Sequence, residues 1–75
     1  MQELVEYIAK SLASNPDEVK VTEVEDDGRT VVRLEVSPED KGRVIGREGR
    51  VAQAIRLLVR VAAVKEGTRA TLEIV

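Results

Sequence analysis

The sequence contains no cysteine and no histidine. Without cysteine the chain can form no disulfide and no thiolate metal site, and without histidine it lacks the commonest metal ligand and the commonest general acid or base. No pair of carboxylates stands out beside the glycines in the middle of the chain to take their place. The composition therefore predicts a protein that is not an enzyme, has no catalytic residues and holds no metal, cofactor or small-molecule substrate.

Aromatic residues and long apolar runs are also scarce. Tyr7 is the single aromatic residue, and no apolar run reaches membrane-spanning length. The first ten residues carry acidic side chains rather than the basic region and apolar core of a signal peptide. We therefore expect a cytoplasmic protein without membrane contact, folded as one domain over residues 1–75.

Charge is present in quantity but is unevenly distributed along the chain. Residues 1–40 hold four basic and eleven acidic side chains, whereas residues 41–69 hold eight basic and two acidic ones. A concentrated positive region next to glycines suggests an anionic partner. From charge alone, however, an ordinary solvated face with scattered arginines is the simpler interpretation.

Hydrophobic periodicity predicts the order helix, strand, strand, helix, helix, strand. The helices are expected at residues 3–13, from Ser37-Pro38 to just before Gly46, and at 50–65, with Ser37 as the cap of the second helix. The strands are expected at 19–25, 30–36 and 69–75, with a hairpin turn at 26–28 and a possible bulge or slipped strand boundary near residues 23–24. An α+β fold, with one three-stranded sheet covered by helices on one face, is the economical architecture.

Two of the five glycines, Gly46 and Gly49, lie directly before the long helix. Glycine lets another backbone approach closely, and the start of a helix favours an anion. With Arg43, Arg47 and Arg50 alongside, this segment is a candidate phosphate clamp, although a tight corner between two helices would also need small residues. The spacing does not match the nucleotide P-loop or the dinucleotide fingerprint.

The run VIGREGR, residues 44–50, resembles the GxxG loop of the KH domain. The element order is similar to that of the type II form, and the resemblance covers the whole chain. A stand-alone KH domain of this length resembles the KhpA family of small bacterial RNA-binding proteins. The resemblance implies an α-β-β-α-α-β type II KH fold.

The same resemblance implies that the loop from Gly46 to Gly49 holds the backbone of about four nucleotides of single-stranded RNA. The implied RNA-binding residues are Arg43, Val44, Ile45, Gly46, Arg47, Glu48, Gly49 and Arg50. Val44 and Ile45 would line an apolar groove for the bases, with Arg33 or Val36 nearby, although core packing is the alternative for both. The family resemblance also implies homodimers or a complex with a KhpB-like KH protein, and a role as a chaperone in post-transcriptional regulation.

Two features indicate weak and poorly sequence-specific RNA binding by a single copy. Glu48 places a negative charge beside the expected phosphate, and the lack of aromatic residues near the loop excludes aromatic base stacking. A second copy or a second protein could raise the effective affinity.

The helix at 50–65 has more apolar surface than one sheet can cover. Gln53, Arg56 and Arg60 are the only polar residues between positions 51 and 64. We assign Ala52, Ile55, Val59 and either Ala62 or Ala63 to the core. A second apolar face then remains, and it is the expected dimer interface: Ala54, Leu57, Leu58 and Val61. Alternatively the N-terminal helix covers this face, or the chain is a protein–protein adaptor that uses the fold as a dimerisation scaffold with little RNA affinity.

Overall fold

The computed structural model describes residues 1–75, and its elements follow the predicted order. The helices are α1 (Gln2–Leu12), α2 (Lys41–Ile45) and α3 (Arg50–Lys65), and the strands are β1 (Lys20–Asp26), β2 (Arg29–Glu35) and β3 (Ala70–Ile74). Short 3-10 turns occupy Pro16–Glu18, Pro38–Asp40 and Arg47–Gly49. The predicted α-β-β-α-α-β arrangement is confirmed.

The sheet has the order β1-β2-β3, so β2 lies in the centre. β1 and β2 form an antiparallel hairpin, whereas β3 pairs with β2 in parallel. A two-residue turn joins the hairpin, and both of its residues have positive φ: 54° for Asp27 and 78° for Gly28. These values are typical of the type I′ turn, whose twist matches that of a hairpin.

The possible bulge near residues 23–24 is absent. Pairing runs without a gap from Lys20 opposite Glu35 to Asp26 opposite Arg29. The imperfect alternation of β1 has a different cause, because β1 is an edge strand in which Val21 is the only buried residue. Val24 lies on the uncovered face of the sheet opposite Val31.

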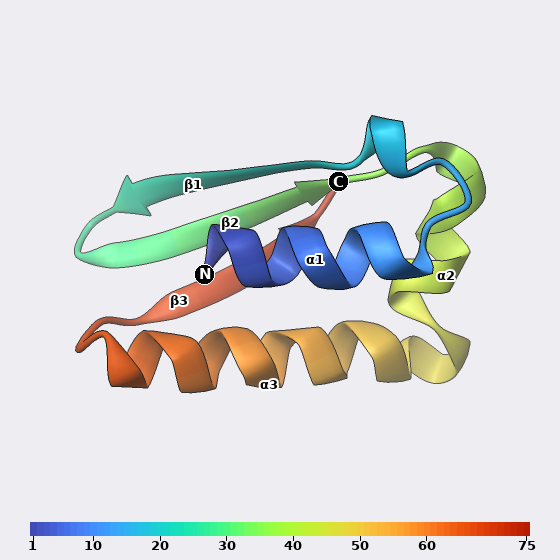
Figure 1. The fold of residues 1–75 in the computed structure, drawn as a ribbon. Helices are drawn as coiled ribbons and strands as arrows, with labels where there is room; N and C mark the ends of the chain where they lie inside the picture. Colours follow the sequence, from blue (N-terminus) through green and yellow to red (C-terminus); the bar gives the residue numbers. More distant parts are fainter.

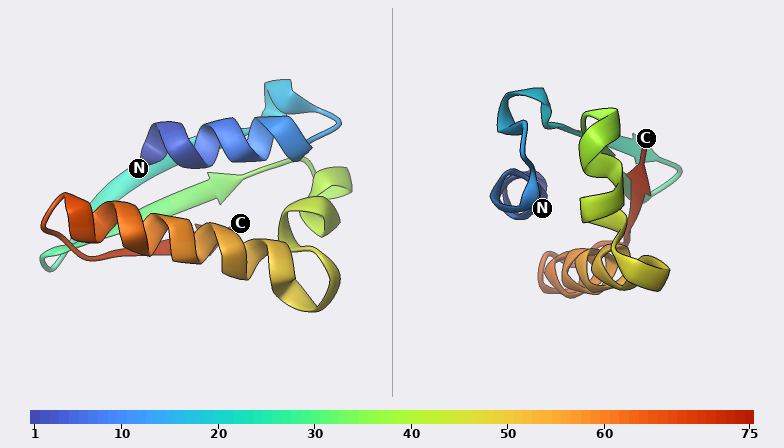
Figure 2. Two further views of the ribbon diagram at one scale, coloured as in Figure 1. Left: turned by 60° about the horizontal axis from the view of Figure 1, so that its bottom comes forward. Right: turned by 90° about the vertical axis from the view of Figure 1, so that its right-hand side faces the viewer.

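Helices α1 and α3 cover one face of the sheet and leave the other face uncovered (Figures 1 and 2). The core lies between the helices and the sheet, and its largest fully buried apolar side chains come from both: Val5, Val32, Leu34, Val44, Ile55 and Val59. The predicted core positions Ala52, Ile55, Val59 and Ala63 of α3 are all buried, while Ala62 is only half-buried. The choice left open between the two alanines therefore falls on Ala63.

The connections between the layers gather at two ends of the molecule. α2 and the glycine segment lie at one end, on the right in Figure 1, beside the start of α3. The β1–β2 turn and the connection from α3 to β3 lie at the opposite end. Because β2 and β3 are parallel, the chain must cross over between them, and α2 with α3 forms that crossover.

Candidate nucleic-acid interface

The glycine segment forms a tight corner between α2 and α3. Helix α2 ends at Gly46, whose φ of 77° and ψ of 173° are open essentially to glycine alone. Its N–H donates to the carbonyl of Gly42 at 2.8 Å and closes the last turn of α2. The N–H of Gly49 then donates to the carbonyl of Gly46 at 3.1 Å and closes the corner.

Gly46 has a second, steric reason to be glycine. A Cβ atom at this position would lie 2.5 Å from Cγ2 of Val51 and 2.9 Å from its backbone nitrogen. The backbone of the corner is therefore pressed onto the first turn of α3. Gly49 shares the positive φ, at 74°, but it has no such steric reason, because a Cβ there would meet nothing within 4 Å.

Of the two residues between these glycines, Glu48 adopts the left-handed conformation, with φ of 58° and ψ of 25°. A side chain other than glycine, asparagine or aspartate is uncommon in this region. The first turn of α3 begins directly afterwards, and its capping residue is Gly49, which has no side chain to accept from the free N–H groups. Those groups and the helix dipole are suited to an anion.

Three arginines surround this corner, and all are exposed. Arg47 forms no ion pair with any carboxylate of the chain. Nη2 of Arg50 lies 3.5 Å from Oε2 of Glu48, and both side chains are so exposed that solvent screening leaves the pair weak. Nε of Arg43 forms a long ion pair with Oδ1 of Asp40 at 3.8 Å. Arg47 is thus the basic side chain that is free to contact a phosphate.

The structure separates the two residues expected to line an apolar groove. Ile45 is 40 % exposed and lies beside the corner, whereas Val44 is fully buried in the core. The Val44 side chain is therefore not available to a base, and core packing is the correct interpretation for it. Val36 is likewise a core residue, and Arg33 lies on the uncovered face of the sheet, where it pairs with Glu73 at 3.4 Å.

Asp40 is a feature that the sequence did not reveal. Its fully buried carboxylate accepts from the backbone N–H of Ser14 and of Asn15, at 2.9 Å each, and from the hydroxyl of Ser37 at 3.1 Å. Ser37 stands at the predicted capping position, but its hydroxyl bonds this carboxylate instead of a backbone N–H. These bonds, that of Ser14 foremost, outweigh burial and hold the pKa of Asp40 below its usual value. Asp40 therefore ties the start of α2 to the end of α1.

The second apolar face of α3 is uncovered. Leu57 is 58 % exposed, Leu58 44 % and Val61 46 %, and Ala54 is exposed as well. Val64, one turn further on, is 71 % exposed and extends the same face. Helix α1 does not cover these residues. The face points away from the sheet, as the spacing of the predicted interface residues requires.

No group of histidine, cysteine or carboxylate side chains is arranged to hold a metal ion. No helix combines the length and the apolar character needed to cross a membrane.

Comparisons with known proteins identify relatives of this chain. The family model described as "KhpA/KhpB, KH domain" matches residues 2–74. RNA-binding protein KhpA of Clostridium acetobutylicum is 51% identical over 75 residues, and that of Caldanaerobacter subterraneus subsp. tengcongensis is 52% identical over 75 residues; each alignment covers 100% of both chains.

A solved structure of Aquifex aeolicus Era is similar in fold, with a TM-score of 0.62 at 22% identity. The match covers 97% of this chain and 28% of Era, so one part of that longer protein has the same arrangement of helices and strands.

Proposed function

The chain belongs to the KhpA/KhpB family of KH domains, and from this premise we propose that it binds single-stranded RNA through the corner from Gly46 to Gly49. The observation that carries the proposal is the tight corner in which Gly46 packs closely on Val51, with the side chains of Arg47 and Glu48 exposed directly before the start of α3. The names of the two bacterial relatives, both RNA-binding proteins, support RNA as the ligand.

In the proposed complex, the phosphates lie against the backbone of the corner and the first turn of α3. Arg47 supplies the free positive charge, and Arg43 and Arg50 add to it from either side. Ile45 offers the exposed apolar surface on which a base can rest. Glu48 opposes the phosphates, so one copy of the domain binds weakly and with little sequence preference.

The first test replaces both residues between the glycines, as Arg47→Asp with Glu48→Asp. RNA binding should be lost, because two carboxylates then face the phosphates and the free arginine is gone. The fold should remain, because both side chains are exposed and aspartate tolerates the left-handed conformation of position 48.

Binding to a fluorescently labelled oligonucleotide is measured by polarisation, together with a thermal melt. Lys10→Asp is the matched control, because it lowers the net charge by the same amount on an exposed site of α1. Unchanged RNA affinity in the loop variant, or equal loss in both variants, would exclude the loop as the binding site.

We further propose that the apolar face of α3, made of Ala54, Leu57, Leu58 and Val61, packs against its copy in a two-fold dimer. Exposed apolar side chains that are contiguous on one helix usually mark an interface, and Val64 enlarges this one. A dimer would present two glycine loops to one RNA and so raise the effective affinity.

The variant Leu58→Asp should dissociate the dimer, because it would bury an unpaired charge at the contact. Gln53→Asp places the same charge on the polar stripe of the same helix and should leave the dimer intact. Sedimentation at tens of micromolar compares the two variants with the wild type. A wild-type monomer, or a Leu58→Asp chain that unfolds instead of dissociating, would refute the interface.

The same face could bind a KhpB-like KH protein in place of a second copy, since one family description covers both kinds of domain. If so, mixing the two proteins should replace the homodimer by a heterodimer, and Leu58→Asp should prevent both. We place this activity in the cytoplasm, where an RNA chaperone of this kind would act in post-transcriptional regulation. If the dimer forms but no RNA binds at low salt, the protein is an adaptor.

A further inference from the structure

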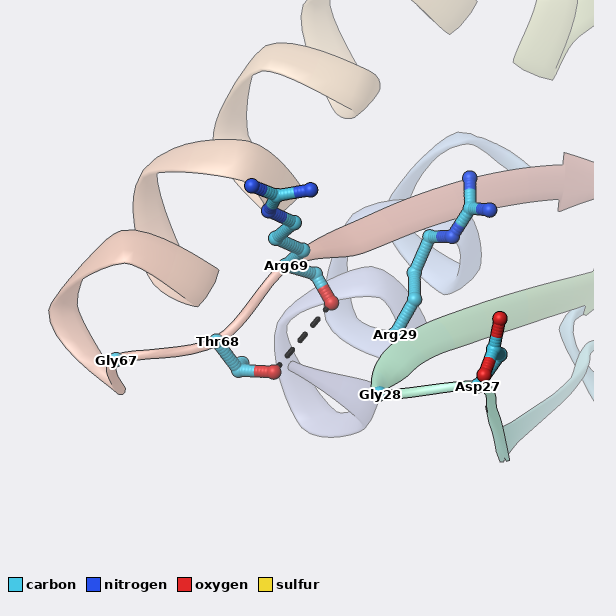
Figure 3. Close-up of a pocket in the computed structure, with 6 residues that line it drawn as sticks. All are labelled: Asp27, Gly28, Arg29, Gly67, Thr68 and Arg69. Atoms are coloured by element: carbon cyan, nitrogen blue, oxygen red, sulfur yellow. Dashed lines mark hydrogen bonds between the residues drawn. The ribbon is translucent and has the colours of Figure 1, made fainter.

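The end of the molecule opposite the glycine loop carries a hollow of about 710 Å3. It lies between the β1–β2 turn and the connection from α3 to β3 (Figure 3). Its lining contains no hydrophobic residue and consists of Asp27, Gly28, Arg29, Gly67, Thr68 and Arg69. An apolar side chain would find no apolar partner in this hollow, whereas an anion would meet two arginines.

Two of these residues are arginines, Arg29 at the start of β2 and Arg69 directly before β3. Thr30 pairs with Ala70 between β2 and β3, which sets Arg29 next to Arg69 at the start of the two strands. Figure 3 shows their guanidinium groups extended to the same side of the hollow. Like charges directly opposite each other on a sheet are unfavourable unless a counter-charge is present.

No carboxylate lies within ion-pair distance of either arginine, although Asp26 pairs with Arg29 across the hairpin. Neither Arg29 nor Arg69 forms an ion pair, although Asp27 lines the same hollow. Glu66, which precedes the connection to β3, is directed to the N-terminal ammonium of Met1 at 3.8 Å. The arrangement is therefore one that an external anion would complete.

A third arginine reaches the same region from α3. An adjoining hollow of about 260 Å3 is lined by Arg60 together with Arg29 and Arg69. Arg60 is exposed and has no ion-pair partner. We call Arg29, Arg60 and Arg69 the far-end arginine site. These three positive charges outnumber the one carboxylate that lines the larger hollow, which is that of Asp27.

A polar stripe on α3 connects this site with the glycine loop. Gln53, Arg56 and Arg60 fall on one narrow side of the helix, between the core positions and the apolar face. Arg56 also has no ion-pair partner. An RNA strand that leaves the glycine loop along this stripe meets unpaired arginines up to the far end.

The length of α3 sets the size of the footprint. Its 16 residues span about 24 Å at about 1.5 Å per residue. A strand stacked as in a DNA duplex, at about 3.4 Å per nucleotide, would need about seven nucleotides to cover this distance. That is longer than the roughly four nucleotides that a GxxG loop holds.

We propose that the far-end arginine site binds backbone phosphates of the same RNA strand that the glycine loop holds, so that the footprint extends along α3. This inference rests on the proposed RNA binding at the loop. RNA is favoured over an acidic peptide because the unpaired arginines continue along α3 to the loop and because the larger hollow offers no apolar contact.

The test compares two oligonucleotides, one of about four and one of about twelve nucleotides, the latter within the usual range of single-strand binding sites. The variant is Arg29→Gln with Arg69→Gln, and a second variant is Arg60→Gln. The matched control, Lys10→Gln with Lys20→Gln, removes the same charge from exposed positions of α1 and β1. Polarisation is measured over a range of salt, with a thermal melt of each chain.

The double arginine variant should bind the short oligonucleotide like the wild type and the long one on the order of tenfold more weakly. Its salt slope on the long oligonucleotide should fall by about 1.4, at about 0.7 for each lost phosphate contact. Arg60→Gln should show a smaller loss of the same kind, and the lysine control should show none.

Equal loss on both lengths, equal loss in the control, or an unchanged salt slope would overturn the far-end site while leaving the loop as the RNA-binding site. Wild-type chain that binds neither oligonucleotide would overturn the proposed function, and the far-end site with it. Binding of an acidic peptide that the long oligonucleotide does not displace would assign the arginines to a protein partner instead.

Discussion

Gly46 offers the sharpest test of the corner's geometry, through the substitution Gly46→Ala. Its φ of 77° and ψ of 173° lie in a region that costs a residue with a side chain about 1–3 kcal/mol. The new Cβ would also lie 2.5 Å from Cγ2 of Val51, and relieving such overpacking costs about 1–3 kcal/mol more. The expected loss in free energy of unfolding is therefore about 2–6 kcal/mol.

That loss is large for a domain of this size. A chain of 75 residues has a stability of about 4–11 kcal/mol at about 0.05–0.15 kcal/mol per residue. Gly46→Ala should therefore leave the protein marginally folded, or force α2 and the corner away from α3. In either case RNA binding should fall together with stability.

Two other glycines of the same region serve as matched controls. Gly49→Ala meets no neighbouring atom but keeps the positive φ of 74°, so it should cost about 1–2 kcal/mol. Gly42 lies within α2, and a Cβ there would meet nothing within 4 Å, so Gly42→Ala should stabilise by about 0.4–1 kcal/mol. The three substitutions add the same methyl group, yet they should differ clearly in their effect on the free energy of unfolding.

Urea denaturation of the three variants and the wild type measures these differences, at one protein concentration because a dimer would link stability to concentration. Equal losses for Gly46→Ala and Gly49→Ala would refute the contact with Val51 as the reason for the first glycine. A destabilising Gly42→Ala would show that the α2 backbone differs from the one described.

Three further outcomes are expected. The pKa of Asp40 is lowered in the folded state, so the stability that its carboxylate contributes is present above the usual pKa near 3.8 and is lost as pH falls through the lower folded value. Denaturation across this pH range should show a steeper loss of stability in acid for the wild type than for Asp40→Asn. Parallel curves would contradict the bonds to Ser14 and Asn15. Glu48→Asn should raise RNA affinity because asparagine carries no charge, and it should stabilise the fold by up to about 1 kcal/mol because asparagine tolerates the left-handed backbone. A drop in affinity measured by polarisation would mean that the Glu48 carboxylate helps to bind RNA. Leu34→Ala should destabilise the fold by about 2–5 kcal/mol because Leu34 is fully buried, whereas Leu57→Ala should change the stability of the dissociated chain by about 0.5 kcal/mol or less because Leu57 is exposed. Thermal melts compare the two variants, and similar losses would mean that Leu57 belongs to the core.

The order of elements and the faces of α3 could be predicted because each depends on spacing along one segment. Ala52, Ile55, Val59 and Ala63 recur at helical spacing, and they are the buried residues of α3. The hairpin turn at 26–28 could be predicted because its Asp27-Gly28 pair is typical of turns that require positive φ at both positions. The bulge considered for β1 was wrong because an edge strand that buries only Val21 need not alternate.

The candidate site was predicted in part. The two glycines and the arginines beside them are local features, so the sequence located the corner. It did not distinguish Val44 from Ile45, because α2 has only five residues, too few for a periodic pattern to show which side faces the core. Docking of α2 against the sheet and α3 buries the first of them and leaves the second exposed.

By itself the sequence determined the succession of helices and strands, the surplus apolar face of α3, and the lack of the side chains that most metal sites and acid–base catalysts use. Only the tertiary structure decided that Asp40 bonds a segment 25 and 26 residues away, that Gly46 rests on Val51, and that Arg29 stands beside Arg69. The physical reason is the range of the interactions. Propensity and periodicity act within one element, whereas these contacts form between elements, whose relative positions are set by packing of the whole core.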